Sequence, residues 1–224
     1  MSRFARIVLC IAAVAACLAV LSPVSMGQTG SQPKTFGTRP PKANTTASSQ
    51  ATPNLIPEGT VTIYSDFGPG YSYFPTGGYE TDSEEPVAMG FTPTQGTYLL
   101  TQIDLAVVWL GGSQNSFKLE LRDDWKGEPD PAPPMASWHV KGVVQYVGEG
   151  PCYVKTIQVK QLIVLQKNHR YWLVMVPDPD AYLGWNGNYD EIGGWLAQSD
   201  NAGLTWDVYY DWLGAFDVLG KKLF

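Results

Sequence analysis

The chain is poor in cysteine, histidine and long apolar runs, and each shortage removes a class of protein. It has three cysteines and two histidines among its 224 residues. Cys10 and Cys17 lie in the first 27 residues, so a chain cleaved after them keeps only Cys152 and forms no internal disulfide. His139 and His169 lie far apart and show no HExxH spacing, which argues against a zinc site. No Gly-x-Ser-x-Gly elbow occurs, so the sequence offers no catalytic signature.

The apolar run at the N-terminus is too short to cross a membrane. Ile7–Leu21 has about 15 residues, whereas a spanning helix needs about 20. Arg3 and Arg6 precede the run, and small residues up to Gly27 follow it. A positive start, an apolar middle and a small-residue cleavage site are typical of a secretory signal peptide. We therefore predict a signal peptide over residues 1–27, a secreted, periplasmic or extracellular location, and no transmembrane segment in the mature chain.

Two other readings of the N-terminus stay open. Val14–Cys17 resembles a bacterial lipobox, in which Cys17 would be lipidated and become the new N-terminus. Leu18–Leu21 continue the apolar run, whereas a lipoprotein usually turns polar after its cysteine. An uncleaved anchor is the third reading. We predict soluble export, with a lipoprotein anchored at Cys17 as the alternative.

Positive charge is scarce in the second part of the chain. The sequence carries 15 basic and 21 acidic residues for a net charge of −6, and nearly all the acidic residues follow position 59. A domain this acidic is repelled by phosphate backbones and by anionic membranes. We therefore expect no nucleic-acid partner, whereas cations and neutral ligands such as sugars suit the charge.

Composition divides the mature chain into a linker, a domain and a short tail. Residues 28–58 are rich in Gln, Thr, Ser, Pro, Ala and Asn, and hold almost no large apolar side chain. Such a segment buries too little surface to offset its ordering entropy, so we predict a disordered linker. Residues 59–220 form the predicted domain, which is large enough to build a core without disulfides. Residues 221–224 form the predicted C-terminal tail.

Alternation of apolar and polar residues dominates the domain. In residues 101–109 the odd positions are apolar, whereas Gln102 and Asp104 face the other way, and residues 117–122 alternate in the same manner. A period of two is typical of half-buried strands, and no segment shows sustained helical periodicity. Turn clusters such as Gly77-Gly78 separate the runs. We predict an all-β fold, a two-sheet antiparallel β-sandwich of jelly-roll type.

One short segment resembles the Asp-box, a β-hairpin turn with the pattern Ser-x-Asp-x-Gly-x-Thr-Trp. Asn201 stands where the pattern has Asp. In this motif the polar side chain holds the turn and the Trp plugs the core. The chain has one copy, whereas sialidase-like propellers have several, so we predict a structural turn and no sialidase. The residues of the predicted turn are Ser199, Asn201, Gly203, Thr205 and Trp206.

A larger pattern covers most of the domain. Its segments are 63–70, 100–106, 136–138, 171–174, 199–206 and 213–220. In order and spacing they resemble the choice-of-anchor R domain of exported bacterial proteins, which often carry a PEP-CTERM sorting tail. The resemblance implies an exported or surface β-sandwich and no established activity. The chain ends at Lys221–Phe224 without such an anchor, and it has Trp125 and Pro129–Pro134 where family loops are Gly-rich, so we expect release rather than attachment.

Carboxylates crowd one predicted loop and suggest the only cofactor. Calcium takes six to eight oxygen ligands, and acidic loops of extracellular β-sandwiches supply them. An acidic turn without a bound metal is the alternative. The residues of the predicted calcium loop are Asp123, Asp124, Glu128 and Asp130.

Aromatic residues gather in the C-terminal third. Flat rings stack on sugar faces, while nearby Asp, Asn and Gln side chains bind hydroxyls. Trp195 and Trp206 are expected in the core. The residues of the predicted glycan platform are Trp185, Tyr189, Tyr209, Tyr210 and Trp212.

The sequence therefore predicts a non-catalytic exported domain with a surface or extracellular interaction role, and glycans as its candidate ligands. The alternative is a carbohydrate-active enzyme or its accessory module, which would need two converging carboxylates beside a cleft. A structural envelope protein is a third hypothesis. The oligomeric state and the pairing of Cys152 stay open.

Overall fold

The computed structural model describes residues 32–37, 59–146, 154–189 and 192–224. The predicted signal peptide, most of the predicted linker and Cys152 lie outside these ranges. Within the described residues every regular element is a strand. The strands are β1 (Thr35–Gly37), β2 (Val61–Ser65), β3 (Tyr73–Thr81), β4 (Val87–Phe91), β5 (Tyr98–Gly112), β6 (Phe117–Trp125), β7 (Glu128–Pro129), β8 (Ala136–Val140), β9 (Val154–Gln158), β10 (Val164–Leu165), β11 (Tyr171–Pro177), β12 (Ala181–Asn188), β13 (Gly193–Gln198), β14 (Asp207–Trp212) and β15 (Phe216–Lys222).

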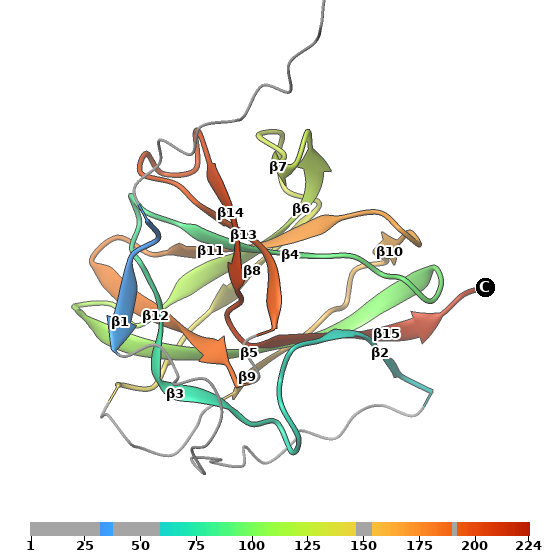
Figure 1. Cartoon of the computed structure of the whole chain (residues 1–224), viewed down its shortest axis with the longest axis horizontal. Coiled ribbons are helices and arrows are strands. Elements are labelled where there is room, and N and C mark those ends of the chain that lie inside the picture. The colour runs from blue at the N-terminus through green and yellow to red at the C-terminus, as the bar shows by residue number, and fades with distance from the viewer. Residues whose placement is uncertain (1–31, 38–58, 147–153, 190–191) are drawn as a thin grey trace, which may run out of the picture. The chain divides into compact units, whose positions relative to one another are not determined.

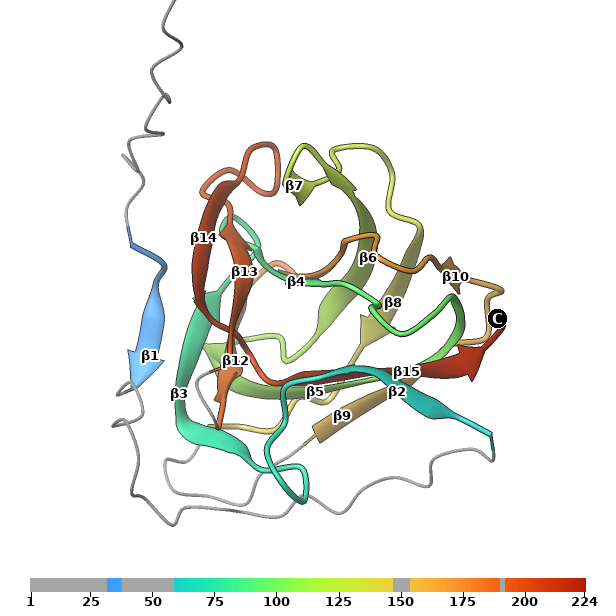
Figure 2. The same cartoon turned by 45° about the vertical axis from the view of Figure 1, so that its right-hand side comes forward.

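The strands form two antiparallel sheets that pack together (Figure 1). The eight-stranded sheet has the order β1-β3-β12-β5-β15-β2. Strands β9 and β10 also pair with β5, on the edge of β5 opposite to β15. The seven-stranded sheet has the order β14-β13-β4-β11-β6-β7, with β8 also paired to β6. Figure 2 shows β5, β9 and β15 in the layer below β4 and β6. The prediction of an all-β, two-sheet antiparallel sandwich is confirmed.

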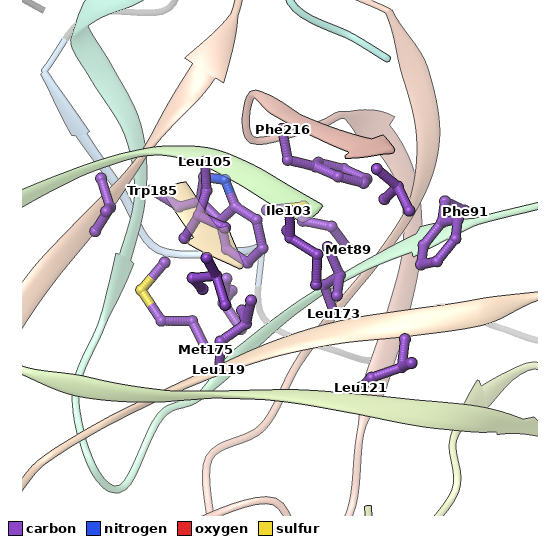
Figure 3. Close-up of a cluster of buried hydrophobic side chains, with 14 of the residues drawn as sticks. Met89, Phe91, Ile103, Leu105, Leu119, Leu121, Leu173, Met175, Trp185 and Phe216 are labelled. Atoms are coloured by element: carbon purple, nitrogen blue, oxygen red, sulfur yellow. The ribbon is translucent and has the colours of Figure 1, made fainter. Parts of the chain in front are cut away.

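The main core lies between the two sheets, where the alternating apolar residues meet. Along β6, Phe117, Leu119 and Leu121 are fully buried, whereas Lys118 between them is exposed. The period of two therefore assigns one face of each strand to the core, as alternation predicts. Figure 3 shows core side chains from both sheets, including Met89, Phe91, Ile103, Leu105, Leu119, Leu121, Leu173, Met175, Trp185 and Phe216.

Strand β1 lies inside the predicted linker, so the prediction of disorder is wrong for these few residues. It pairs with the edge of β3. Phe36 is 7 % exposed, and its ring fills the space above Gly184, where an added Cβ would lie 2.4 Å from the ring. The ring of Tyr146 meets Phe36 edge to face, with centroids 5.5 Å apart. Lys34 forms an ion pair with Glu85. These contacts hold a short segment against the edge of the eight-stranded sheet.

The outer face of the eight-stranded sheet differs from the expectation of a polar, solvated surface. Gln102 and Asp104 lie on β5 opposite the core, yet both are almost fully buried. Phe67 and Tyr71, from the segment between β2 and β3, form ring contacts with each other, and Phe67 also contacts Tyr73. Tyr71 is hydrogen-bonded to Asp104, so this segment covers part of the outer face.

Candidate functional site

The outer face of the seven-stranded sheet carries neighbouring exposed aromatic side chains. Leu196 of β13 and Tyr209 of β14 belong to the core, so the adjacent residues Trp195 and Tyr210 project to the other face. Trp195 and Tyr210 are register partners, and their rings meet edge to face with centroids 5.4 Å apart. Trp195 is 41 % exposed and Tyr210 is 67 % exposed. Both rings are therefore accessible to a ligand.

Two glycines let these rings lie close to the sheet. A Cβ on Gly90 of β4 would lie 3.2 Å from both Trp172 and Trp195. Trp172 lies opposite Gly90 on the neighbouring strand β11. A Cβ on Gly193 would lie 3.1 Å from the ring of Tyr210, so this ring rests against the backbone of Gly193. The aromatic face is the name we give to the surface made by Tyr210, Trp195 and Arg170, next to which the ring of Trp172 is completely buried.

Arg170 supplies the positive charge of the aromatic face. Its guanidinium carbon lies 4.8 Å from the centre of the Trp195 ring and 5.7 Å from that of Trp172. A cation over an aromatic ring is attracted by the electron-rich ring face. The nearest recorded carboxylate is Asp124, whose Oδ1 lies 3.4 Å from Arg170 Nη1. The same Oδ1 accepts a 2.9 Å hydrogen bond from Trp172 Nε1. Ring stacking and charge therefore fix the orientation of this arginine.

The structure corrects most of the predicted glycan platform. Trp185 is completely buried and donates from Nε1 to the carbonyl of Ala215, so its ring cannot stack on a sugar. Tyr209 is 6 % exposed and Trp212 is 4 % exposed, which excludes them as a stacking surface as well. Tyr189 is half-buried, against Gly68. Of the five predicted residues, Tyr210 alone is widely exposed and belongs to the aromatic face.

The expectation that Trp195 packs in the core is also corrected, because Trp195 lies exposed on the outer face. Trp206 is half-buried and packs, as expected, against buried apolar residues, which are the small cluster of Ala88, Trp172, Val174 and Ala197 on the same face. The signal for Trp195 was present in the sequence, because Leu196 is the next residue along β13 and neighbouring residues of a strand face opposite sides.

The predicted calcium residues lie at the β6–β7 hairpin, but the side chains of the three aspartates serve separate partners. Asp123 is hydrogen-bonded to His169, and Asp124 accepts from the backbone N–H of Gly127 at 3.1 Å. Asp130 accepts from the backbone N–H of Ala132 at 2.9 Å. Glu128 pairs with Trp125 through the backbone. In the described ranges no group of three or more His, Cys, Asp or Glu side chains is arranged to hold a metal, so calcium binding here stays a prediction.

The Asp-box-like segment forms a turn between β13 and β14. The hydroxyl of Ser199 donates to Asn201 Oδ1 at 2.9 Å and accepts from the backbone N–H groups of Asn201 and Gly203. Asn201 is hydrogen-bonded to Thr205 through both its amide nitrogen and its oxygen. Trp206 lies on the outer face instead of plugging the core between the sheets. The turn sets the register that places Trp195 opposite Tyr210.

Replacing Ser199 by alanine should destabilise the domain by about 1 to 3 kcal/mol, because the loss leaves two backbone N–H groups without their acceptor. Urea denaturation would measure the change in free energy of unfolding. Ser137→Ala is the matched control, since Ser137 is exposed on β8 and should cost little. Equal stability of the two variants would contradict the role given to Ser199.

A row of polar side chains crosses the outer face of the eight-stranded sheet. Asp104 of β5 lies opposite Asp217 of β15. Thr156 of β9 lies opposite Asp104, and Ser65 of β2 lies opposite Asp217. Thr156 donates to Asp104 at 2.6 Å, while the hydroxyl of Tyr71 is hydrogen-bonded to both aspartates. Tyr71 has a φ of 61°, in the left-handed region that a tyrosine rarely adopts. The acidic row is the name we give to Thr156, Asp104, Asp217 and Ser65.

Burial changes the acidity of this pair. Asp104 is 2 % exposed and Asp217 is 5 % exposed. Burial raises the pKa of Asp217 to about 6, with a further rise from the charge of Asp104 and an opposing effect of the hydrogen bond from Ser65. Burial also raises the pKa of Asp104, against the hydrogen bonds from Thr156 and Gln102. Oδ1 of Asp217 has no hydrogen-bond partner among the described residues. The pair therefore keeps a proton at a higher pH than an exposed aspartate does.

Converging carboxylates are what a glycoside hydrolase needs, but these two lie beneath Tyr71 and not in a cleft. An open pocket of about 500 Å³ lies elsewhere, lined in part by Asp82, Glu84 and Asp180. There Oδ1 of Asp82 accepts from the backbone N–H of Glu84 at 2.9 Å, so it stabilises the β3–β4 turn.

Within the described part of the chain, no helix has the length and apolar character needed to cross a bilayer.

Comparison with known proteins adds no relative. No protein-family model matches the sequence, and neither a curated protein nor a solved structure matches it. The resemblance to the choice-of-anchor R domain therefore stays a prediction.

Proposed function

We propose that the domain is a non-catalytic carbohydrate-binding module of an exported protein, and that its glycan lies on the aromatic face. The observation that carries the proposal is the exposed ring of Tyr210, which rests on Gly193 beside the half-exposed ring of Trp195. A sugar ring has an apolar C–H face that stacks on the flat face of a single exposed aromatic ring such as that of Tyr210. An exposed aromatic pair of this kind serves no core, so a binding role explains its position.

Polar groups beside the rings suit the hydroxyls of a sugar. Arg170 offers N–H donors next to Trp195, and Asp124 offers carboxylate oxygens next to Arg170. Binding sites of small ligands combine an apolar contact surface with a few placed polar groups of this type. The acidic charge of the whole chain favours a sugar over a nucleic acid as the partner of this face.

Location outside the cytoplasm is part of the proposal. It is supported by the positive, apolar and small-residue pattern of residues 1–27. An exported domain meets the polysaccharides of envelopes, matrices and surrounding material, which are the ligands that a flat aromatic surface would bind.

Replacing Tyr210 by alanine should lower glycan affinity about tenfold or more, since the variant removes the most exposed stacking ring. Stability should change little, because the side chain is mostly in solvent. A glycan array probed with the full chain would identify ligands, and isothermal titration would compare the variant with the unchanged protein.

Leu204→Ala is the matched control for the Tyr210 variant. Leu204 is 78 % exposed at the tip of the β13–β14 turn, so its loss removes a similar apolar surface outside the aromatic face. Affinity should then be unchanged. Full binding by the Tyr210 variant would place the ligand elsewhere, and no binding to any glycan by the unchanged chain would overturn the proposed function in favour of a protein partner.

A further inference from the structure

The two arginines of the outer face of the seven-stranded sheet differ in how far their hydrogen-bonding capacity is used. Arg122 of β6 binds Glu120 through Nε and Nη2, at 2.8 Å and 2.7 Å. Its Nη1 donates to the carbonyl oxygens of Asp130 and Ala132, at 2.7 Å and 3.0 Å. The guanidinium of Arg122 is therefore occupied by the protein itself and serves to hold the loop after β7.

In the part of the chain that the structure describes, Arg170 has no comparable set of acceptors. Among the described residues its ion-pair partner is Asp124, at 3.4 Å, which is longer than a normal N–H···O hydrogen bond. Asp124 already accepts from Trp172 Nε1 and from the backbone N–H of Gly127. A guanidinium has five N–H donors in a planar fork. Most of the donors of Arg170 are thus available to a ligand, and its side chain is 26 % exposed.

The surroundings hold Arg170 in place before any ligand arrives. Its guanidinium lies over the ring of Trp195 and near that of Trp172, and these contacts restrict rotation of the side chain. The Trp195 ring contacts Tyr210 in turn, with centroids 5.4 Å apart. One or two sugar rings stacked on Tyr210 would therefore bring their substituents to Arg170. A fixed guanidinium loses little entropy on binding, which increases its contribution to affinity.

We propose that Arg170 selects glycans that carry an anionic group, with the guanidinium receiving a carboxylate or a sulfate of a glycan whose sugar ring stacks on Tyr210. This inference rests on the proposed function, because it names the class of glycan for the same site. The planar fork of arginine matches the two oxygens of such a group and binds them with two parallel hydrogen bonds.

The overall acidity of the chain limits the reach of this attraction. With a net charge of −6, the protein repels a polyanion at long range, so the charge of Arg170 acts only on a group brought into contact by stacking. Anionic polymers that lack a sugar ring should therefore bind poorly. The contact with Arg170 should also weaken as salt is added, since exposed charges are screened.

Affinity electrophoresis of the full chain in gels containing polygalacturonate, dextran sulfate or neutral dextran would test the proposal. Arg170→Gln should reduce affinity for the anionic ligand at least tenfold and leave neutral dextran unaffected. Arg170→Lys keeps the positive charge but lacks the planar fork, so its affinity for the anionic ligand should lie between those of the unchanged chain and Arg170→Gln. Lys167→Gln is the matched control, because it removes the same charge from an exposed position three residues away.

The outcomes separate this inference from the proposed function. Retention by polygalacturonate alone identifies the carboxylate as the recognised group, and retention by dextran sulfate alone identifies the sulfate. Equal binding of the unchanged chain and Arg170→Gln to both anionic polymers overturns the inference, whereas the proposed function survives if binding still depends on Tyr210. No retention by either anionic polymer overturns the inference, whereas the glycan array decides on the proposed function. Near-UV circular dichroism of Arg170→Gln checks that the aromatic residues keep their tertiary packing.

Discussion

Gly187→Ala is expected to lose about 3 kcal/mol or more of its free energy of unfolding, because the added methyl group has no space. A Cβ on Gly187 would lie 1.5 Å from a ring atom of Trp212, and two more atoms of that ring lie at 2.5 Å. The ring cannot move aside easily, since Trp212 is 4 % exposed and packs on Tyr79 with centroids 5.3 Å apart. Urea denaturation followed by tryptophan fluorescence would measure the loss.

Gly111→Ala is the control for that substitution. Gly111 also lies in a strand, but the nearest atom to its added Cβ is Tyr182 Cδ1 at 3.9 Å, an ordinary contact. Alanine is there expected to be neutral or slightly stabilising, because glycine loses more conformational freedom on folding. If Gly187→Ala were as stable as Gly111→Ala, the close packing of β12 against Trp212 would be contradicted.

Asp217→Asn is expected to stabilise the domain by about 3 kcal/mol at pH 8, the value of a pKa shift of roughly two units. Asparagine keeps an oxygen that can accept from Ser65 and Tyr71, and its amide can donate to Asp104 across the strand pair. The variant therefore removes a buried charge that faces another carboxylate. Thermal and urea unfolding at several pH values would measure the difference between the two proteins.

The sign of the pH dependence follows from the direction of the shift. Burial raises the pKa of Asp217 in the folded state, to about 6, above the value of an exposed aspartate. The folded state then binds more protons than the unfolded state between these two values, so this contribution to stability is complete at low pH and is lost as the pH rises through about 6. The gain from Asp217→Asn should accordingly vanish near pH 4. A gain that is the same at pH 4 and pH 8 would contradict the buried-charge explanation.

Asp178 provides a control of opposite sign. Burial alone would raise its pKa, but hydrogen bonds from Ser116 and His139 bring the pKa below the usual value. His139 Nε2 lies 2.6 Å from the Asp178 carboxylate. Asp178→Asn should therefore destabilise the domain at neutral pH, and this loss should shrink as the pH falls through the pKa of the folded-state carboxyl.

Alternation was enough to predict the class of fold, since a period of two fixes both the strand and its buried side. It could not tell which polar positions would be covered by another segment. Gln102 and Asp104 have the pattern of a solvated face, yet both are buried, and Tyr71 lies against Asp104. Such burial depends on contacts between residues far apart in the sequence, which a local pattern does not predict.

The candidate site shows the same limit more sharply. A count of aromatic residues along the C-terminal third favoured Trp185 and Trp212, which the structure buries, over Trp195, which it exposes. The side on which a large ring lies depends on strand parity, and Leu196 beside Trp195 carried that information. The position of Arg170 close to two tryptophan rings depends on pairing between β4, β11 and β13, which no single segment reveals.

Strand β1 covers the edge of β3, which would otherwise be open to other molecules. An uncovered strand edge offers backbone N–H and C=O groups to any passing chain and promotes aggregation. Here Thr35–Gly37 pairs with β3, and Phe36 fills the notch above Gly184. These three residues thereby cover the edge of β3. A mechanical force applied at the N-terminus would act on the β1–β3 hydrogen bonds before it acted on β2.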